Sequence, residues 1–239
     1  MLSAQNLTKQ YGNHTALRDL NLQVNPGEVF CLLGANGAGK TTTINLFMGF
    51  LQPTAGTVRI NDIDVATRAA ETKQHLAYIP ENLNLYQNLT GLENLRFFTG
   101  LANVSLDDHT ATELLHSVGL QAGAIRQRVS TYSKGMRQKV GIAIAKAKRA
   151  DNLLLDEPTS GLDPQASNDF ARLIQDMRGA GVAVLMATHD LFRAKETGTH
   201  VGIMRAGVLV HTLATDDIKL NDLERLYLET VWAEPLSAD

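Results

Sequence analysis

The chain has 239 residues and a net charge of −3, so it offers no basic surface of the kind that binds nucleic acid. With 44% hydrophobic residues it can bury a core, yet no stretch approaches the ~20 apolar residues of a membrane-spanning helix. Residues 1–10 lack the basic-then-apolar order of a signal peptide, and the single cysteine, Cys31, excludes an intrachain disulfide.

The first predicted elements are strands. Apolar residues alternate at Leu20, Leu22 and Val24, which is typical of a half-buried strand. The short apolar run 28–33 follows a Pro-Gly turn and has the pattern of a strand buried on both faces. We therefore expect Cys31, inside this run, to be a small buried hydrophobic residue rather than a nucleophile.

A glycine-rich loop follows directly and matches G-x-x-x-x-G-K-[ST] over 34–41. Its backbone N–H groups would surround a polyphosphate, and the helix expected over 42–51 would point the positive end of its dipole at the same charge. Lys40 would reach the β and γ phosphates, and the Thr41 hydroxyl would bind Mg²⁺. The predicted phosphate-binding residues are Gly34, Asn36, Gly37, Ala38, Gly39, Lys40, Thr41 and Thr42.

The middle of the chain is predicted to be helical, from residue 90 to about 148, because apolar residues recur there at helical spacing. We expect Phe97 and Phe98 to belong to the core of this part rather than to a ligand site. Its last helix opens at Ser133-Lys134-Gly135, and such a turn presents free backbone donors. Taken alone, Ser133 is better explained as a helix cap with nothing bound.

A second apolar run, 153–155, ends in Asp156 and Glu157, where a parallel strand would emerge at the ligand edge of a sheet. An aspartate there can hold Mg²⁺, and the adjacent glutamate can align or deprotonate an attacking water. An acidic pair alone usually solvates a turn. Together with the phosphate loop, this pair predicts ATP hydrolysis, with Asp156 as a metal ligand and Glu157 as a catalytic residue.

Strands and helices return in the last third of the chain. A strand over 182–187 leads into Thr188-His189-Asp190, and a strand pair is expected around Ala206-Gly207. Residues 216–230 have the spacing of an amphipathic helix, which we expect to pack on the domain.

The ordered set of phosphate loop, Tyr132–Lys139 segment, Asp156-Glu157, Ser160–Asp163 loop and His189 resembles the nucleotide-binding subunit of an ATP-binding cassette (ABC) transporter, from residue 2 to about 213. The resemblance implies an α/β fold: a P-loop NTPase cassette of the ABC type with a mixed sheet core, an antiparallel β part and an inserted helical subdomain. It implies a single ABC ATPase domain over 1–239. Its parts are a core lobe (1–88 and 150–215), a helical signature subdomain (89–149) and a C-terminal helical tail (216–239).

The resemblance also implies roles for individual residues. Ser133 and Gly135 belong to the signature, which contacts the γ-phosphate held by a partner subunit. The catalytic switch residue is His189, which senses the γ-phosphate and positions water. Asp163 links the two sites across the dimer, and Tyr11 stacks on adenine.

Two positions depart from the commonest family pattern. Glu81 stands where many members have glutamine; its carboxylate can still reach Mg²⁺ as a metal ligand but adds negative charge beside a triphosphate. The signature reads Tyr-Ser-Lys-Gly rather than Leu-Ser-Gly-Gly, and Lys134 either helps to neutralise phosphate or solvates a helix start. Both variants are similar to the ABC-2 export branch.

The function implied is that of an ATPase that uses ATP and Mg²⁺ and drives export through separate transmembrane permease subunits. It would act as a homodimer or with a paired ABC subunit, peripherally at the cytoplasmic face of the inner membrane, with indirect membrane contact and no nucleic-acid partner. We expect Leu83, Leu85 and Tyr86 to be exposed and to contact the permease. The alternative is a soluble ABC ATPase serving assembly, as in iron-sulfur cluster biogenesis, although its usual Ser-Gly-Gly signature is missing here.

Overall fold

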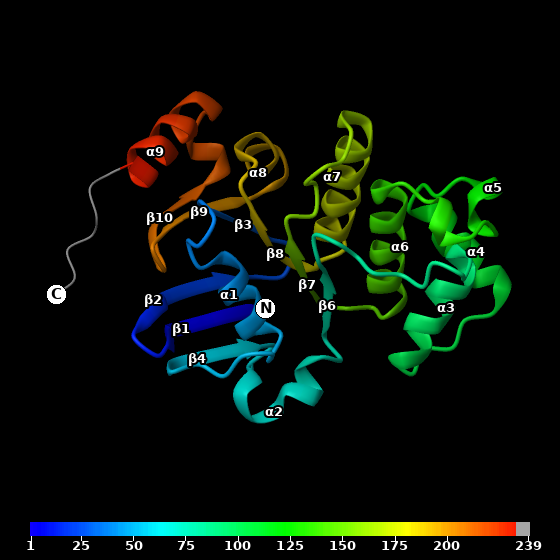
Figure 1. The fold of residues 1–239 in the computed structure, drawn as a ribbon, viewed down its shortest axis with the longest axis horizontal. Coiled ribbons are helices and arrows are strands. Elements are labelled where there is room, and N and C mark those ends of the chain that lie inside the picture. Colours follow the sequence, from blue (N-terminus) through cyan, green and yellow to red (C-terminus); the bar gives the residue numbers. More distant parts are fainter. Residues whose placement is uncertain (233–239) are drawn as a thin grey trace.

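The computed structural model describes residues 1–232 and contains two β-sheets with a helix between them, and a separate group of helices to one side (Figure 1). The first sheet is antiparallel, with the strand order β2-β1-β4-β5. Leu20, Leu22 and Val24 are buried, as their alternation predicted. The strands are β1 (Leu2–Tyr11), β2 (His14–Val24), β4 (Ala55–Ile60) and β5 (Ile63–Asp64).

The second sheet is mixed and has the order β10-β9-β3-β8-β7-β6. All neighbouring strands in it are parallel except β10, which pairs antiparallel with β9. Every residue of β3 and β8 is buried, as expected for parallel strands that are covered on both faces. The strands are β3 (Val29–Leu33), β6 (Leu76–Ile79), β7 (Asn152–Asp156), β8 (Ala183–Thr188), β9 (His200–Arg205) and β10 (Val208–Ala214). The predicted fold class is therefore confirmed.

The central strand β3 divides its side chains between two hydrophobic cores. Phe30 and Leu32 pack with α1 and the antiparallel sheet, whereas Cys31 and Leu33 belong to the core on the opposite face. Cys31 is fully buried, and burial raises the pKa of its thiol, so it remains protonated. This confirms that Cys31 is a core residue.

Helices α3 to α6 form the group that we call the helical lobe, which lies at the right of Figure 1. The remaining helices cover the sheets. The α-helices are α1 (Lys40–Phe47), α2 (Val65–Thr72), α3 (Gly91–Leu101), α4 (Asp108–Ser117), α5 (Ala122–Ile125), α6 (Lys134–Ala147), α7 (Pro164–Gly179), α8 (Leu191–Thr197) and α9 (Leu220–Trp232). Short 3₁₀ turns occupy Val129–Thr131 and Thr215–Asp217.

Two helix ends differ from the prediction. α1 stops at Phe47 rather than near residue 51, because Gly49 adopts a left-handed conformation that ends the helix (φ +67°). The tail helix begins at Leu220 rather than at 216, since a 3₁₀ turn precedes it. Residues 233–239 of the predicted tail lie outside the described residues.

Two burial predictions were wrong, and Leu83, also predicted to be exposed, is half-buried against the core. Leu85 is only 4% exposed, because Asn94 accepts a hydrogen bond from Tyr86 N (2.8 Å) and donates one to Tyr86 O (3.0 Å), which folds this segment onto α3. Phe97 is 39% exposed, since successive residues of a helix point in different directions and only Phe98 packs against the core. Tyr86 is exposed as predicted, at 48%, and contacts the edge of the Phe97 ring.

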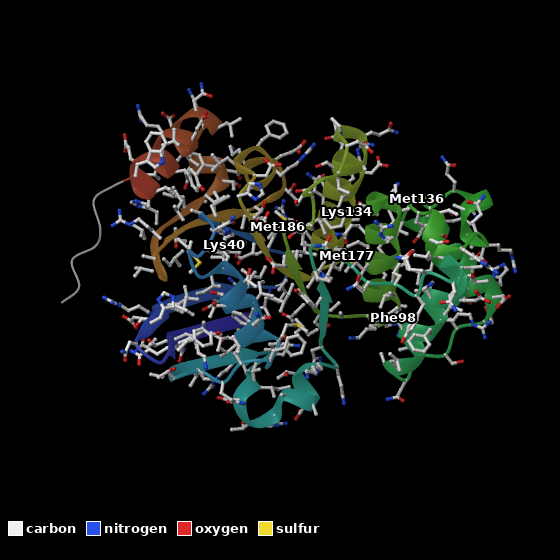
Figure 2. The ribbon with its side chains drawn as sticks, viewed as in Figure 1. Lys40, Phe98, Lys134, Met136, Met177 and Met186 are labelled. Atoms are coloured by element: carbon white, nitrogen blue, oxygen red, sulfur yellow. The ribbon has the colours of Figure 1, made fainter. Side chains whose placement is uncertain are left out.

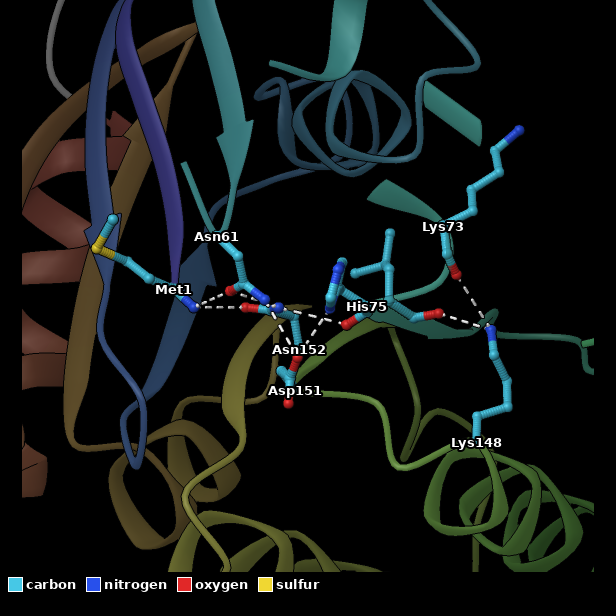
Figure 3. A network of polar contacts seen from close by, with 8 residues as sticks. Met1, Asn61, Lys73, His75, Lys148, Asp151 and Asn152 are labelled. Carbon is cyan, nitrogen blue, oxygen red and sulfur yellow. Dashed lines mark hydrogen bonds and ion pairs between the residues drawn. The ribbon is translucent and has the colours of Figure 1, made fainter. Parts of the chain in front are cut away.

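A polar network joins the two sheets at the end where β7 begins (Figure 3). The Asn152 side chain donates to Asn61 Oδ1 (3.2 Å), and Asn61 in turn donates to the Asp151 carboxylate (3.1 Å). Asp151 also lies 2.9 Å from His75 Nδ1. On the same side, Lys148 at the end of α6 donates to Leu76 O (2.8 Å). These contacts fix the amino ends of β6 and β7, and so the direction in which their carboxyl ends point.

Candidate functional site

The carboxyl ends of four parallel strands meet at one edge of the mixed sheet, where α/β proteins bind their ligands. β3 leads into the phosphate loop and β6 into Pro80-Glu81. β7 ends at Asp156, and His189 follows the last residue of β8. The topology thus brings together residues that lie far apart in the sequence.

A cavity of about 390 Å³ opens at this edge, a size within the range of small-molecule sites. Among the predicted residues, it is lined by Tyr11, Asn36, Gly37, Ala38, Gly39, Lys40, Thr41, Thr42, Glu81, Asp156 and Glu157. Three lining residues were not predicted, namely His14, Ala16 and Ala35. The hairpin that pairs Tyr11 with His14 was the available signal for His14, because it places both residues at one end of the antiparallel sheet.

The phosphate loop needs glycine at Gly39. Its φ of +106° lies in the region that residues with a side chain rarely adopt, and a Cβ there would lie 2.9 Å from Ala16 O. Gly39 is also the residue before α1, so it sets how the amino end of that helix faces the cavity. The loop therefore presents backbone N–H groups at a helix N-terminus, which is an arrangement suited to an anion.

The Lys40 side chain is buried and folded back onto the loop. Its Nζ donates to Gly34 O (2.6 Å) and to Ala35 O (3.4 Å), and lies 3.8 Å from Glu157 Oε1. Burial lowers the pKa of Lys40, and the charges of Glu157 and Asp156 partly offset that effect. Gly34 does not line the cavity, but its carbonyl orients the lysine that does.

Asp156 lies next to Thr41, the residue expected to share a metal ion with it. Burial raises the pKa of the Asp156 carboxyl, and Glu157 and Glu81 raise it further, whereas a Thr41 hydrogen bond and Lys40 lower it. The cavity is therefore rich in carboxylate charge beside a single buried lysine. Such a site favours a bound cation together with a phosphate-bearing ligand.

Glu157 is held in an unusual backbone conformation, with φ of +45°. Its N–H donates to Ala187 O on the neighbouring strand (2.8 Å), which fixes the backbone at this position. The carboxylate contacts His189 Nδ1 at 2.9 Å and accepts from the His189 backbone N–H at 3.3 Å. Strain that is held by the surrounding structure is common at functional sites, because it sets the direction of a side chain.

The remaining predicted residues lie away from the cavity. Ser133 caps α6 by accepting from Met136 N (3.2 Å), and Asp163 caps α7 by accepting from Ala166 N (2.8 Å). Both are exposed. Gly135 lets these helices approach, since a Cβ there would lie 2.9 Å from Ala166 Cβ. Figure 2 shows Lys134, which follows Ser133 in the sequence, on the helical-lobe side and apart from Lys40.

Residues 17–160 match the family model described as ABC transporter, which is more than half of the chain. The chain therefore belongs to the ABC transporter family. The class of protein that this family and the cavity define is an ATP-binding cassette, which is an ATPase.

Curated relatives agree with this assignment. The chain is 34% identical over 96% of its length to the bacitracin transport ATP-binding protein BcrA of Bacillus licheniformis, and spans 74% of that protein. It is also 34% identical over 92% of its length to the probable multidrug ABC transporter ATP-binding protein YbhF of Escherichia coli. It spans only 38% of the length of that relative.

Solved structures share the fold. One described as the ATP-binding subunit of an ABC transporter has 30% sequence identity and a TM-score of 0.84, and covers 96% of this chain and 98% of its own. A dimeric, post-hydrolysis structure of the ATP-binding cassette MJ0796 bound to ADP and Pi has 25% identity and a TM-score of 0.79, with coverage of 90% and 99%. Within residues 1–232 of the present chain, no helix has both the length and the apolar character needed to span a membrane.

Proposed function

We propose that this chain is the ATP-hydrolysing subunit of an ABC transporter and drives export through separate transmembrane subunits. The observation that carries this proposal is the meeting of Lys40, Thr41, Asp156 and Glu157 at one cavity. They supply a phosphate anchor, two oxygen ligands for a metal and a carboxylate for the attacking water. Two relatives are named for bacitracin transport and for multidrug transport, which supports transport over the assembly alternative.

Magnesium fits this site. Within residues 1–232 no group of three or more His, Cys, Asp or Glu side chains is arranged to hold a metal ion alone. Mg²⁺ does not require such a group, because it takes one or two protein oxygens and completes its shell with phosphate and water. The Thr41 hydroxyl and the Asp156 carboxylate would supply those oxygens, with Glu81 as a further ligand on the same cavity. When bound, the ion would neutralise charge on the transferring phosphoryl group.

The contacts of Glu157 suggest which role each residue of the cavity has in ATP hydrolysis. In this structure Lys40 is close to Glu157 (3.8 Å), and His189 touches the same carboxylate (2.9 Å). A phosphate chain would take over Lys40 and leave Glu157 free to accept a proton from water. His189 would then hold the Glu157 carboxylate in position and sense the γ-phosphate, while Tyr11, which is 45% exposed, would stack on the adenine ring.

The positions of Ser133, Gly135 and Asp163 support a head-to-tail dimer. They lie at helix N-termini outside the cavity of their own chain. A second subunit, rotated by a two-fold axis, would place its ATP against Ser133 and Gly135, and Asp163 would join the two sites. The likeness to a dimeric cassette bound to ADP and Pi supports this arrangement.

A groove of about 700 Å³ between β6 and the helical lobe is the proposed contact for the permease. Its lining is mostly apolar and includes Leu83 and Phe98, together with Lys73 and Lys148. Leu85 lies in the floor of the groove rather than on the surface. A short helix of a transmembrane partner would fit here and carry nucleotide-driven closure into the membrane. Through it the subunit would bind peripherally to the cytoplasmic face.

The dimer is tested with a hydrolysis-blocked chain, Glu157→Gln. We expect MgATP to shift this variant towards twice the monomer mass in light scattering, because a ligand bound mainly by the closed dimer favours that state. Mg²⁺-free ATP is the matched control. A mass that stays monomeric with MgATP, both alone and with a co-purified permease, would contradict the proposal.

The permease contact is tested separately. Leu101 is 68% exposed in the groove, so Leu101→Glu should abolish co-purification with the permease while ATP binding by the isolated chain stays normal. Leu228→Glu, on the exposed side of α9, is the control and should retain the permease. If Leu101→Glu still assembles, the groove is not the contact.

A further inference from the structure

Two of the residues at which this chain departs from the usual cassette sequence, Glu81 and Lys134, lie beside each other. Glu81 Oε1 is 4.0 Å from Lys134 Nζ. The same oxygen accepts a hydrogen bond from the Ser160 hydroxyl at 3.0 Å. Three separate segments therefore meet at one carboxylate: the loop after β6, the start of α6 and the turn after β7.

A second residue of α6 joins the same segments. Gln138 lies one helical turn after Lys134 and is 1% exposed. Its amide nitrogen is 3.4 Å from Pro80 O and 3.4 Å from Pro158 O, and its Oε1 accepts no hydrogen bond from the described residues. The two Gln138 contacts are long for hydrogen bonds, so they can rearrange at low cost. The start of α6 is thus placed to respond when the loop of Glu81 moves.

Glu81 also belongs to the nucleotide cavity. It lines that cavity together with Asp156, and its charge helps to raise the pKa of the Asp156 carboxyl. One carboxylate therefore has two possible partners: Lys134 and Ser160 on one side, and a metal bound at Asp156 on the other. A glutamine at 81 with a glycine at 134 would lack this charge pair.

We infer that Lys134 is a positioning residue for Glu81. Lys134 and Ser160 hold the Glu81 carboxylate until nucleotide and metal occupy the cavity, and the transfer of Glu81 to the metal releases Lys134 towards the nucleotide of the partner subunit. This inference rests on the proposed function and deepens it, because it links occupancy of one site to the signature of the other.

The pair is weak enough to be exchanged. The Glu81 side chain is 46% exposed and that of Lys134 is 23% exposed, so solvent screens their attraction. Pairs of this kind change an equilibrium by about 1.4-fold to 5-fold. A divalent ion therefore competes successfully with Lys134 for the carboxylate.

The first test measures binding rather than activity. The affinity of the monomer for a non-hydrolysable ATP analogue is compared with and without Mg²⁺. Lys134→Gln should increase the gain in affinity due to Mg²⁺ by about twofold to fivefold, because Glu81 no longer has to leave a charged partner. Ser160→Ala should act in the same direction. In a Glu81→Gln background, Lys134→Gln should have no effect on that gain.

The second test measures dimer formation in the Glu157→Gln background and distinguishes the role of Lys134 from that of Ser160. Lys134→Gln should weaken the MgATP-dependent dimer, Lys134→Arg should restore it, and Ser160→Ala should leave it intact. Arg172→Gln, which removes an exposed charge from α7, should change neither binding nor dimer formation.

The outcomes distinguish this inference from the proposed function. If the wild-type chain binds no analogue, the proposed function is wrong. If it binds, but Lys134→Gln changes the Mg²⁺-dependent gain by the same factor in the wild-type and the Glu81→Gln backgrounds, Lys134 does not act through Glu81. An unchanged dimer in Lys134→Gln would overturn its release to the partner.

Discussion

The nucleotide cavity and the start of α6 differ in how much of their chemistry this chain satisfies by itself. In the cavity, Lys40 contacts two backbone carbonyls and Glu157, and Glu157 in turn contacts His189. At the start of α6, Ser133 caps only its own helix and is exposed. The cavity is therefore arranged before nucleotide binds, whereas the signature has no phosphate to contact within its own chain.

This difference indicates a division of labour between binding and assembly. Residues of the cavity should control nucleotide affinity and chemistry in the monomer. Ser133, at the start of α6, should control only what depends on a second subunit, whereas Lys134 should also affect Mg²⁺-dependent binding through Glu81. Variants of the two regions should then fail in different assays.

The largest effect is expected within the cavity. Glu157→Gln should bind ATP but hydrolyse it at least ~100-fold more slowly, which is the lower range for a lost general base. Lys40→Ala should also lose ATP affinity, because it removes the buried cation that we propose as the phosphate anchor. Steady-state turnover and equilibrium ATP binding check both. Wild-type turnover in Glu157→Gln would contradict its role, and unchanged affinity in Lys40→Ala would contradict the phosphate anchor.

At the start of α6, Ser133→Asp separates capping from phosphate contact. Aspartate caps a helix as well as serine does, so the melting temperature should stay within about 2 °C of wild type. Its negative charge should nevertheless repel the partner's phosphate and prevent the ATP-dependent dimer, while analogue binding by the monomer stays normal. Asp107→Asn, which keeps a capping side chain at the exposed start of α4, is the control and should leave the dimer intact. A normal Ser133→Asp dimer would mean that the signature does not face phosphate.

The two regions also differed in how far the sequence predicted them. The fold class was predictable, and so was the proximity of Lys40 to Asp156 and Glu157. A local sequence pattern identifies the phosphate loop, and the residues at the carboxyl ends of parallel strands lie at the same edge of a sheet. The roles assigned to Ser133, Gly135 and Asp163 stay predictions, since a monomer does not test them.

What the sequence did not predict depends on tertiary contacts. Leu85 is buried because the distant Asn94 bonds both backbone groups of Tyr86, and no periodicity reports such a contact. The meeting of Glu81, Lys134 and Ser160 likewise depends on how α6 packs against two loops. Local sequence patterns therefore predicted the helices, the strands and the cavity. The contact of Glu81 with Lys134 and Ser160 depends on tertiary packing, which those patterns do not report.

A smaller effect tests whether the helical lobe is independent of the cavity. Thr90 and Glu93 form a capping box at the start of α3, in which each side chain accepts from the backbone N–H of the other residue. Thr90→Ala should cost about 1 kcal/mol and lower the melting temperature by about 2–4 °C, with unchanged analogue affinity. Ser105→Ala, at an exposed loop position of the same lobe, is the control. A clear loss of analogue affinity in Thr90→Ala would show that the lobes are coupled before nucleotide binds.

The smallest effect concerns the stability of the nucleotide-free cavity. Burial raises the pKa of Asp156 in the fold, so the folded chain disfavours the ionised carboxylate. This penalty is full above the folded-state pKa and disappears as the pH falls through it, because the folded state then takes up the proton that the unfolded state binds less readily. Asp156→Asn should therefore melt slightly above wild type at neutral pH in chelator, with a difference that narrows towards acid pH. Asp176→Asn, an exposed change on α7, should show no such narrowing. An Asp156→Asn variant that melts lower than wild type at neutral pH would mean that the contacts with Thr41 and Lys40 outweigh burial, and that the cavity stabilises its own charges without a ligand.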